Sequence, residues 1–226
     1  MTVASRCPRC LGGLRAPGLM SSQWLCPAHG AVQPLQTHSL EALAVVAHGS
    51  RVPLWAPVPL LPGWTLTGLA SAGDERTGSG ATAVALSGPS PVGGPADLVL
   101  VAEEPGTGLG ARLAGVSGID AGDRVTGPPE AKVLAAGHPT GLWRCQDPPT
   151  GSSTDAAPGG GADSPDGRAL DRVAFVGEAG GVWLWAVLWP PAAELVLLEH
   201  VELQDLRHTA EEGLRMPHGA PTTRLP

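Results

Sequence analysis

Cys7-Pro-Arg-Cys10, followed after fifteen residues by Cys26-Pro-Ala-His29-Gly30, decides the fold of the N-terminal region. Two pairs of metal ligands, each pair separated by two residues, are typical of a zinc ribbon, in which two tight turns hold one tetrahedral ion. The proline in each turn fixes φ, and Gly30 supplies a left-handed residue after the second pair. Because four protein ligands complete a tetrahedral site, we predict a structural Zn²⁺ ion held by Cys7, Cys10, Cys26 and His29.

The four ligand positions could also serve other roles. Disulfides or buried thiols would leave His29 unexplained, and the six residues before Cys7 lack the apolar run of an export signal. Iron also binds tetrahedral thiolate sites, so the metal in the cell could be zinc or iron, although three thiolates and one imidazole at a closed site favour zinc. We expect Gly12 and Gly13 to give the first turn the backbone freedom that Gly30 gives the second.

The composition is that of a globular protein with a negative net charge. The chain has 226 residues, of which 42% are hydrophobic and seven are Trp, and its formal net charge is −7. A negative charge argues against broad attraction to nucleic acid or to an anionic membrane. Neither a signal peptide nor a membrane-spanning run is visible, so we predict a cytoplasmic protein. Cys145 lies outside the ligand set, beside Leu142 and Trp143, and is interpreted as a buried thiol and not a nucleophile.

The order of patterns along the chain predicts an α+β protein in three parts. Residues 1–36 form the zinc ribbon, and residues 37–208 form a mainly antiparallel β-sheet domain with one or two short helices. Within that domain, residues 147–167 are rich in Pro, Gly and Asp, which is typical of a disordered loop insert. The last part, residues 209–226, lacks a hydrophobic period and is predicted to be a flexible tail.

Hydrophobic periodicity places the elements of the sheet domain. A helix is predicted from Ser39 to Gly49. A proline-rich extended segment from Val52 to Trp64 is interpreted as packing against an apolar surface, and the alternative is a docking groove for a partner or ligand. Residues 182–189 alternate between two apolar faces, as expected of a central strand that is covered on both sides. The other predicted strands are residues 22–25, 64–70, 81–86, 97–103, 140–145, 172–176 and 195–203, and residues 132–136 fit either a strand or a short helix.

The sequence contains neither a G-x-S-x-G elbow nor an H-E-x-x-H motif. Gly106–Arg112 follows a predicted strand and superficially resembles a phosphate-binding loop, but it matches no complete nucleotide-binding pattern, so we interpret it as a glycine-rich helix start. Glu103 and Glu104 are interpreted as solvated acids at a strand end. An enzyme would instead need a pocket that joins His138 or His200 to one of these glutamates.

These patterns together resemble an uncharacterised actinobacterial protein family with an N-terminal zinc ribbon. The residues that carry the resemblance cover most of the chain and are Cys7-Pro-Arg-Cys10 through Arg15-Ala-Pro-Gly18, Trp24-Leu-Cys26 through His29-Gly30, Leu61-Pro-Gly-Trp64, Leu98 to Glu104, Ala131 to Gly137 and Trp183-Leu-Trp-Ala186. Members of that family look like proteins of unknown function, and some carry an automatic phosphotransacetylase label that no feature of this sequence supports. The resemblance implies the organisation of the chain but no reaction.

The leading functional hypothesis is a cytoplasmic protein in which a structural zinc ribbon is joined to an α+β domain that binds a protein partner or a small molecule. It rests on a closed metal site without a catalytic constellation, and no residue is assigned a catalytic or organic cofactor role. One alternative is an enzyme whose site lies on the sheet domain. Another is nucleic-acid binding through Arg6, Arg9 and Arg15, which precede the first acidic residue, although the net charge opposes it.

Overall fold

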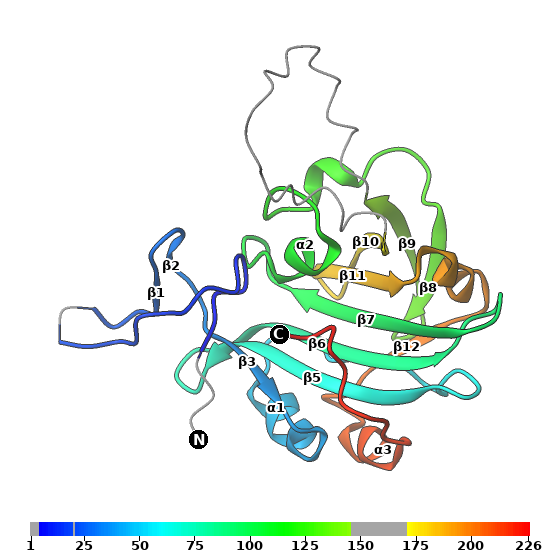
Figure 1. Ribbon diagram of the computed structural model, residues 1–226, viewed down its shortest axis with the longest axis horizontal. Helices are drawn as coiled ribbons and strands as arrows, with labels where there is room; N and C mark the ends of the chain where they lie inside the picture. The colour runs from blue at the N-terminus through cyan, green and yellow to red at the C-terminus, as the bar shows by residue number, and fades with distance from the viewer. Residues whose placement is uncertain (1–4, 20, 146–170) are drawn as a thin grey trace, which may run out of the picture.

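The computed structural model describes residues 5–19, 21–145 and 171–226, so the predicted insert at 147–167 lies outside the described part of the chain. Figure 1 shows the arrangement of the helices and strands. The strands are β1 (Leu25–Cys26), β2 (Gly30–Ala31), β3 (Leu35–His38), β4 (Trp55–Pro57), β5 (Thr65–Asp74), β6 (Gly78–Pro89), β7 (Pro95–Glu103), β8 (Ala131–Ala135), β9 (His138–Cys145), β10 (Val173–Ala179), β11 (Val182–Trp189) and β12 (Glu202–Asp205). The helices are η1 (Leu40–Ala42), α1 (Leu43–Gly49), α2 (Leu109–Ala114), η2 (Gly122–Arg124), η4 (Pro191–Leu198) and α3 (Ala210–Arg215).

Ten of the strands form one sheet, in the order β3-β5-β6-β7-β11-β10-β9-β8-β12-β4. Its neighbouring strands are antiparallel except β8 and β12, which run parallel. This arrangement, with its few short helices, confirms the predicted α+β class with a mainly antiparallel sheet.

Most of the predicted elements of the sheet domain are confirmed. The strands predicted at 64–70, 81–86 and 97–103 are β5, β6 and β7, which run further than predicted because their hairpins continue the pairing to the turns. Residues 132–136, 140–145 and 172–176 correspond to strands β8, β9 and β10, and the predicted helix before them is η1 followed by α1. In the N-terminal region, the strand predicted at 22–25 is wrong in position, because β1 starts only at Leu25.

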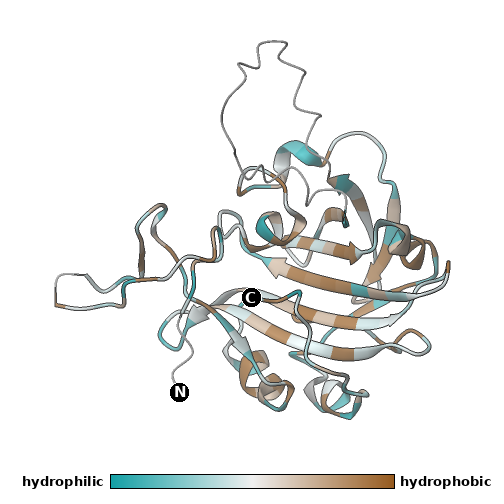
Figure 2. Ribbon diagram, viewed as in Figure 1, coloured by the Kyte–Doolittle hydropathy of each residue, from teal (hydrophilic) through white to brown (hydrophobic). Residues whose placement is uncertain are grey.

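Strand β11 lies between β7 and β10, as its two apolar faces predicted. Leu184 and Ala186 belong to the first core cluster, on one face of the sheet, whereas Trp185 and Val187 belong to the second core cluster, on the other face. All four side chains are buried. Figure 2 shows the apolar residues along β7 and β11. Because burial of one large aliphatic side chain contributes about 1.5–3 kcal/mol, the two clusters supply much of the stability of the fold.

The sheet curls so that its last strand, β4, contacts β6 and β7. The Thr82 hydroxyl on β6 donates a hydrogen bond of 2.6 Å to the Pro53 carbonyl, which fixes the chain just before β4 across the sheet. Residues 52–57 are all buried, so the packing interpretation is confirmed for this part of the proline-rich segment. Part of this segment is a strand and not a polyproline crossing, because Trp55 to Pro57 pair with β12.

The strand predicted at residues 195–203 is wrong. Residues 191–198 form the 3₁₀ helix η4, and the strand that follows, β12, covers only residues 202–205. The buried side chains of η4 are Ala193, Val196 and Leu197, a spacing that suits a helix. A short apolar run between turn signals fits either type of element, and here a proline in the first turn favours the helix.

The predicted flexible tail at the end of the chain is also wrong. Ala210–Arg215 form helix α3, which packs against α1 (Figure 1). The chain then runs beside β5, where the N–H of Leu66 donates to the Pro217 carbonyl at 2.9 Å and the N–H of Gly219 donates to the Leu66 carbonyl at 2.8 Å. Leu225 is buried in the second core cluster. An irregular segment of this kind has no hydrophobic period, so a sequence pattern does not reveal it.

Candidate metal centre and adjoining cleft

The four predicted ligands meet in the metal-binding segment, which we define as residues 5–36. Cys7 and Cys10 lie on its first turn, whereas Cys26 ends β1 and His29 lies in the turn that joins β1 to β2. The Sγ atoms of Cys10 and Cys26 are 3.7 Å apart. Nδ1 of His29 lies 3.7 Å from Sγ of Cys7 and 3.5 Å from Sγ of Cys26. All four ligand atoms lie within 4.8 Å of one another.

The three distances of 3.5 to 3.7 Å fit edges of a tetrahedron around one ion. Metal–sulfur bonds of about 2.3 Å and metal–nitrogen bonds of about 2.1 Å place two sulfur atoms about 3.8 Å apart and a sulfur and a nitrogen about 3.6 Å apart. A disulfide would need a sulfur–sulfur distance of about 2.05 Å, and Cys7, Cys10 and Cys26 form none. The four side chains therefore lie close enough to bind a metal ion, and the disulfide alternative is excluded by this geometry.

The thiols of the cluster differ in their surroundings. Cys7 is fully buried, and burial raises the pKa of its thiol to about 11. Burial also acts to raise the pKa of the Cys26 thiol, but hydrogen bonds from the backbone N–H of Ala28 and from the His29 side chain outweigh it and lower this pKa to about 6. A cation at the centre of the cluster would favour the thiolate form of each cysteine.

The residue after each ligand pair has a left-handed backbone. Gly30 has φ +68°, as predicted, and Leu11 has φ +61°. The prediction that Gly12 and Gly13 supply the left-handed residue of the first turn is wrong. Leu11, directly after Cys10, has the left-handed conformation instead. A left-handed residue with a Cβ costs about 1–2 kcal/mol. The Leu11 side chain offsets part of this cost by packing against the second core cluster.

Backbone pairing and one arginine attach the metal-binding segment to the sheet. Arg6 and Leu35 exchange backbone hydrogen bonds of 3.1 and 2.8 Å at the start of β3, which itself pairs with β5. The Arg9 guanidinium donates to the carbonyls of Gly106 at 2.5 Å and Thr107 at 3.3 Å. Arg9 is thus engaged within the protein, which weakens the alternative that it contacts nucleic acid.

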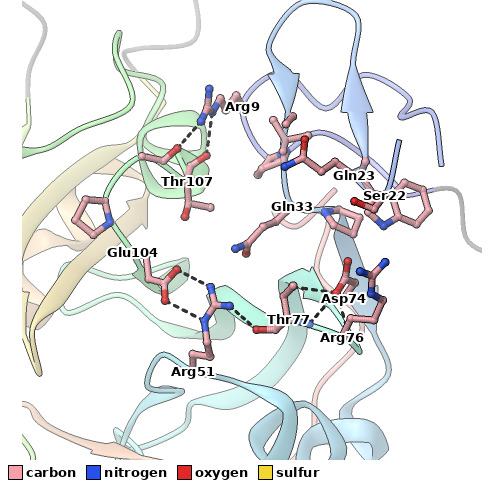
Figure 3. A pocket seen from close by; sticks show the side chains of 17 residues that line it. Arg9, Ser22, Gln23, Gln33, Arg51, Asp74, Arg76, Thr77, Glu104 and Thr107 are labelled. Carbon is pink, nitrogen blue, oxygen red and sulfur yellow. Dashed lines mark hydrogen bonds and ion pairs between the residues drawn. The ribbon is translucent and has the colours of Figure 1, made fainter. Parts of the chain in front are cut away.

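A cleft of about 520 Å³ lies between the metal-binding segment and the sheet (Figure 3). Arg9, Trp24 and Gln33 line it from the metal-binding segment. Arg76, at the turn between β5 and β6, and Glu104, after β7, line it from the sheet. Apart from Arg9, the sequence gives no reason to group these side chains, because they come from separate turns and loops that only the fold brings together.

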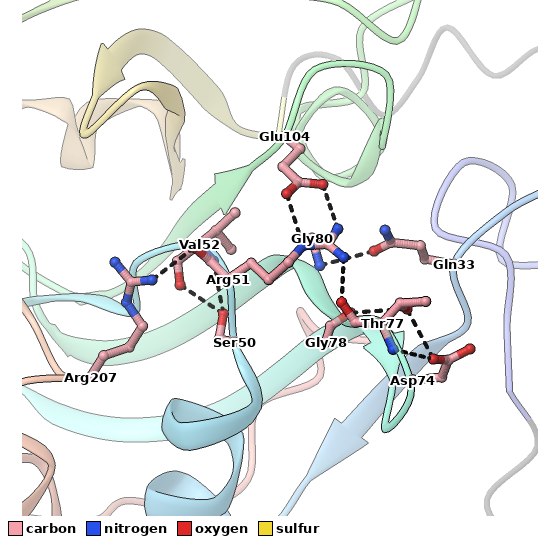
Figure 4. A network of polar contacts seen from close by, with 10 residues as sticks. All are labelled: Gln33, Ser50, Arg51, Val52, Asp74, Thr77, Gly78, Gly80, Glu104 and Arg207. Atoms are coloured by element: carbon pink, nitrogen blue, oxygen red, sulfur yellow. Dashed lines mark hydrogen bonds and ion pairs between the residues drawn. The ribbon is translucent and has the colours of Figure 1, made fainter.

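Arg51 organises one side of the cleft (Figure 4). Its Nε and Nη2 atoms donate to the two carboxylate oxygens of Glu104 at 3.0 and 2.6 Å, and Nη1 donates to the Thr77 carbonyl. Oε1 of Gln33 accepts a hydrogen bond of 2.9 Å from the N–H of Gly80. A Cβ at Gly80 would lie 2.7 Å from oxygens of both Gln33 and Glu104, so glycine permits this close approach.

The histidines that an enzyme would have needed do not line the cleft. Glu104 does line it, whereas His138 begins β9 and His200 lies between η4 and β12. Among the residues that the structure describes, the cleft therefore brings neither histidine to a glutamate. Cys145 is buried, as its apolar neighbours predicted, and its thiol donates to the Trp143 carbonyl at 3.8 Å.

Glu103 is buried, which corrects its interpretation as a solvated acid. It ends β7, and its Oε2 accepts a hydrogen bond of 2.7 Å from the N–H of Leu109, the first residue of α2. Helix α2 thus confirms the glycine-rich helix start. Burial raises the pKa of the Glu103 carboxyl to about 7, although the N–H groups of Gly110 and Leu109 act to lower it. The Trp185 indole lies nearby, but neither its N–H nor Oε1 of Glu103 has a hydrogen-bond partner within the described residues.

We expect Glu103→Gln to remove a pH dependence of stability. The pKa of Glu103 is raised on folding from 4.5 to about 7, so the folded state binds this proton more tightly than the unfolded state does. The free energy of unfolding therefore falls as the pH rises from about 4.5 to about 7 and levels off above. Glutamine is neutral at every pH and keeps an oxygen that can accept the N–H of Leu109.

Urea denaturation of both proteins at pH 5 and pH 8 measures this effect. Between these pH values the wild-type protein should lose about 2–3 kcal/mol relative to Glu103→Gln. A stability difference between the two proteins that stays the same at both pH values would contradict the raised pKa.

The comparisons with known proteins concern the chain as a whole. A family model described as "Family of unknown function (DUF6758)" matches residues 1–157 and 166–225, which include all four ligand positions and the residues that line the cleft. No curated protein and no solved structure matches the chain. Within the described residues, no helix has both the length and the apolar character needed to cross a membrane.

Proposed function

The chain belongs to this family of unknown function, and we propose that it is a binding protein in which a structural zinc ion holds the metal-binding segment against the sheet domain and so maintains a small-molecule cleft. One observation carries the proposal: one wall of the cleft is formed by the metal-binding segment and the other by the sheet domain. Loss of the metal would therefore disturb the cleft as well as the segment.

Zinc is the ion that best suits the four ligands. Three thiolates and one imidazole form a soft, tetrahedral donor set, for which zinc is favoured over magnesium, calcium and manganese, and over iron at a closed site of this composition. Because four protein atoms complete the tetrahedron, no coordination position is left for a reacting water. The role of the ion is to hold the two turns together.

The metal-binding segment depends on this ion because it has almost no core of its own. Its buried side chains, among the described residues, are Cys7, Pro8, Cys26, Pro34 and Leu35. Two of these five are metal ligands. In modules of this kind the free energy of metal binding is also the free energy of folding, on the order of 10 kcal/mol for zinc.

The size of the cleft and the state of the cysteines support the remaining parts of the proposal. A volume of about 520 Å³ falls within the range of about 300–1,000 Å³ that is usual for sites that bind small molecules. Free thiols close to one another persist in a reducing compartment, so we place the protein in the cytoplasm.

Metal analysis of the purified full chain tests the proposal. Mass spectrometry of the metal content should give one zinc ion per chain. After removal of the ion with a strong chelator, amide hydrogen exchange should become fast in residues 5–36 and at Asp74, Arg76 and Thr77, the cleft residues where β5 turns toward β6. Addition of zinc should restore protection. Absence of a stoichiometric metal, or unchanged exchange at the cleft after chelation, would overturn the proposal.

A further inference from the structure

The acidic side chains that line the cleft already have hydrogen-bonding partners within the protein. The Glu104 carboxylate is paired with Arg51 through both of its oxygens. Oδ1 of Asp74 accepts hydrogen bonds from the N–H groups of Arg76 and Thr77 and from the Thr77 hydroxyl, at 2.9 to 3.0 Å. Both carboxylates that line the cleft are therefore already engaged by groups of the protein.

Two arginines of the cleft form no ion pair with an acidic side chain of the described residues. The Arg9 guanidinium bonds only to backbone carbonyls, and its Nη1 atom has no hydrogen bond within the described residues. The Arg76 side chain is exposed and makes neither a hydrogen bond nor an ion pair with any described residue. Burial acts to raise the pKa of the Asp74 carboxyl, but hydrogen bonds from Thr77 and from the backbone of Arg76 and the positive charge of Arg76 lower it, so the Arg76 side chain interacts with Asp74 only through its charge. Figure 3 shows Arg76 at the edge of the cleft, beside Asp74.

The cleft is therefore positive on a chain that is negative overall. Three arginines and two carboxylates line it, which leaves a net charge of +1, whereas the whole chain carries −7. A local positive charge inside a concave surface attracts anions and disfavours cations.

The uncharged part of the lining offers flat apolar surfaces. Trp24 is half-buried and lines the cleft together with Pro8, Pro34 and Pro105. The faces of an indole and of proline rings pack well against a planar ring. Nε2 of Gln33 has no hydrogen bond among the described residues and adds a donor on the same side.

We propose that the cleft binds a small organic anion that carries a planar ring, with its acidic group at Arg76 and its ring against Trp24. This inference rests on the proposed function and adds the class of ligand. A carboxylate and a phosphate monoester share the chemistry that the arginines recognise, and the experiment separates them. Among the arginines, Arg76 is the specificity-determining residue, because Arg9 also attaches the metal-binding segment and Arg51 is saturated by Glu104.

Calorimetric titration of the zinc-loaded full chain tests the inference with a matched set of probes. Phenyl phosphate and benzoate carry the ring and a negative charge, benzylamine carries the ring and a positive charge, benzamide is neutral, and inorganic phosphate lacks the ring. We expect the ring-bearing anions to bind about tenfold more tightly than inorganic phosphate, and binding of benzylamine and benzamide to be undetectable. Raising the salt concentration should weaken the binding of the anions.

Arg76→Gln is the test variant, and Arg15→Gln is its control. Both arginines are exposed, so neither substitution removes buried contacts, but Arg15 does not line the cleft. Arg76→Gln should weaken binding of phenyl phosphate by about tenfold or more, whereas Arg15→Gln should leave it unchanged. Trp24→Leu should weaken binding of phenyl phosphate more than that of inorganic phosphate.

Each outcome separates this inference from the proposed function. If benzamide or benzylamine binds as tightly as phenyl phosphate, the ligand class is wrong although the cleft is a binding site. If none of the five probes binds up to 10 mM, or if both arginine variants behave alike, the inference is also overturned. Failure of the proposed function shows independently, as a missing zinc ion or as a cleft that chelation does not alter.

Discussion

Cys7→Ser is expected to abolish stoichiometric metal binding and to unfold the metal-binding segment while the sheet domain stays folded. Cys7 is fully buried, and its Sγ lies 3.7 Å from Nδ1 of His29, so it is one corner of the proposed metal tetrahedron. A serine hydroxyl is a poor ligand for zinc, and three remaining ligands should lower the metal affinity by more than about a hundredfold. With few buried side chains of its own, the segment cannot replace this free energy by packing.

Metal content and limited proteolysis of the purified variant measure this effect. We expect less than about a tenth of an equivalent of metal. Cleavage should occur within residues 5–33, and the fragment that contains the sheet domain should resist further digestion. Cys145→Ser is the matched control, because it removes a buried thiol from β9, outside the metal cluster. A Cys7→Ser protein that keeps one equivalent of metal and the protection of the wild-type segment would refute the assigned ligand set.

Gly110→Ala is expected to destabilise the sheet domain by about 3 kcal/mol. An added Cβ at Gly110 would lie 2.2 to 2.4 Å from three ring atoms of Trp185. Trp185 is fully buried on β11, between two other strands, so the ring has no open space into which it can move. Helix α2 would have to shift away from the sheet, and this shift would also disturb the hydrogen bond between Leu109 and Glu103.

The midpoint of urea denaturation, followed by tryptophan fluorescence, measures the stability of Gly110→Ala. Gly49→Ala is the matched control, because Gly49 also lies in a helix but has no atom within 4 Å of an added Cβ. That control should be neutral or more stable than the wild-type protein by up to about 1 kcal/mol. Equal stability of Gly110→Ala and Gly49→Ala would mean that α2 does not pack on Trp185.

The features that could be predicted from the sequence are those that depend on neighbouring residues. The spacing between Cys7 and Cys10, and between Cys26 and His29, determines that each pair can face one ion, and these four side chains do come together. The alternation along β11 likewise determines two apolar faces, and the strand lies at the centre of the sheet. In both cases the pattern specifies local geometry directly.

The features that could not be predicted depend on contacts between distant segments. Glu103 is adjacent to Glu104 in the sequence, yet it is buried, because α2 folds over it and supplies a hydrogen bond. The cleft combines side chains such as Gln33, Arg51 and Arg76, which come from separate turns and strand ends. Neither burial of a single acid nor a cleft of this kind leaves a periodic trace in the sequence.

The way the chain runs along β5 also bears on self-association. An unpaired strand edge exposes N–H and C=O groups that can pair with a second molecule and start aggregation. Strand β3 pairs with residues 69–72 of β5, and the segment after α3 bonds to Leu66 and Thr67, with a hydrogen bond of 2.8 Å from the N–H of Thr222 to the Thr67 carbonyl. Strand β3 and the segment after α3, which come from opposite ends of the chain, thus pair one after the other with the same edge of β5. This pairing protects the sheet against edge-to-edge aggregation along β5.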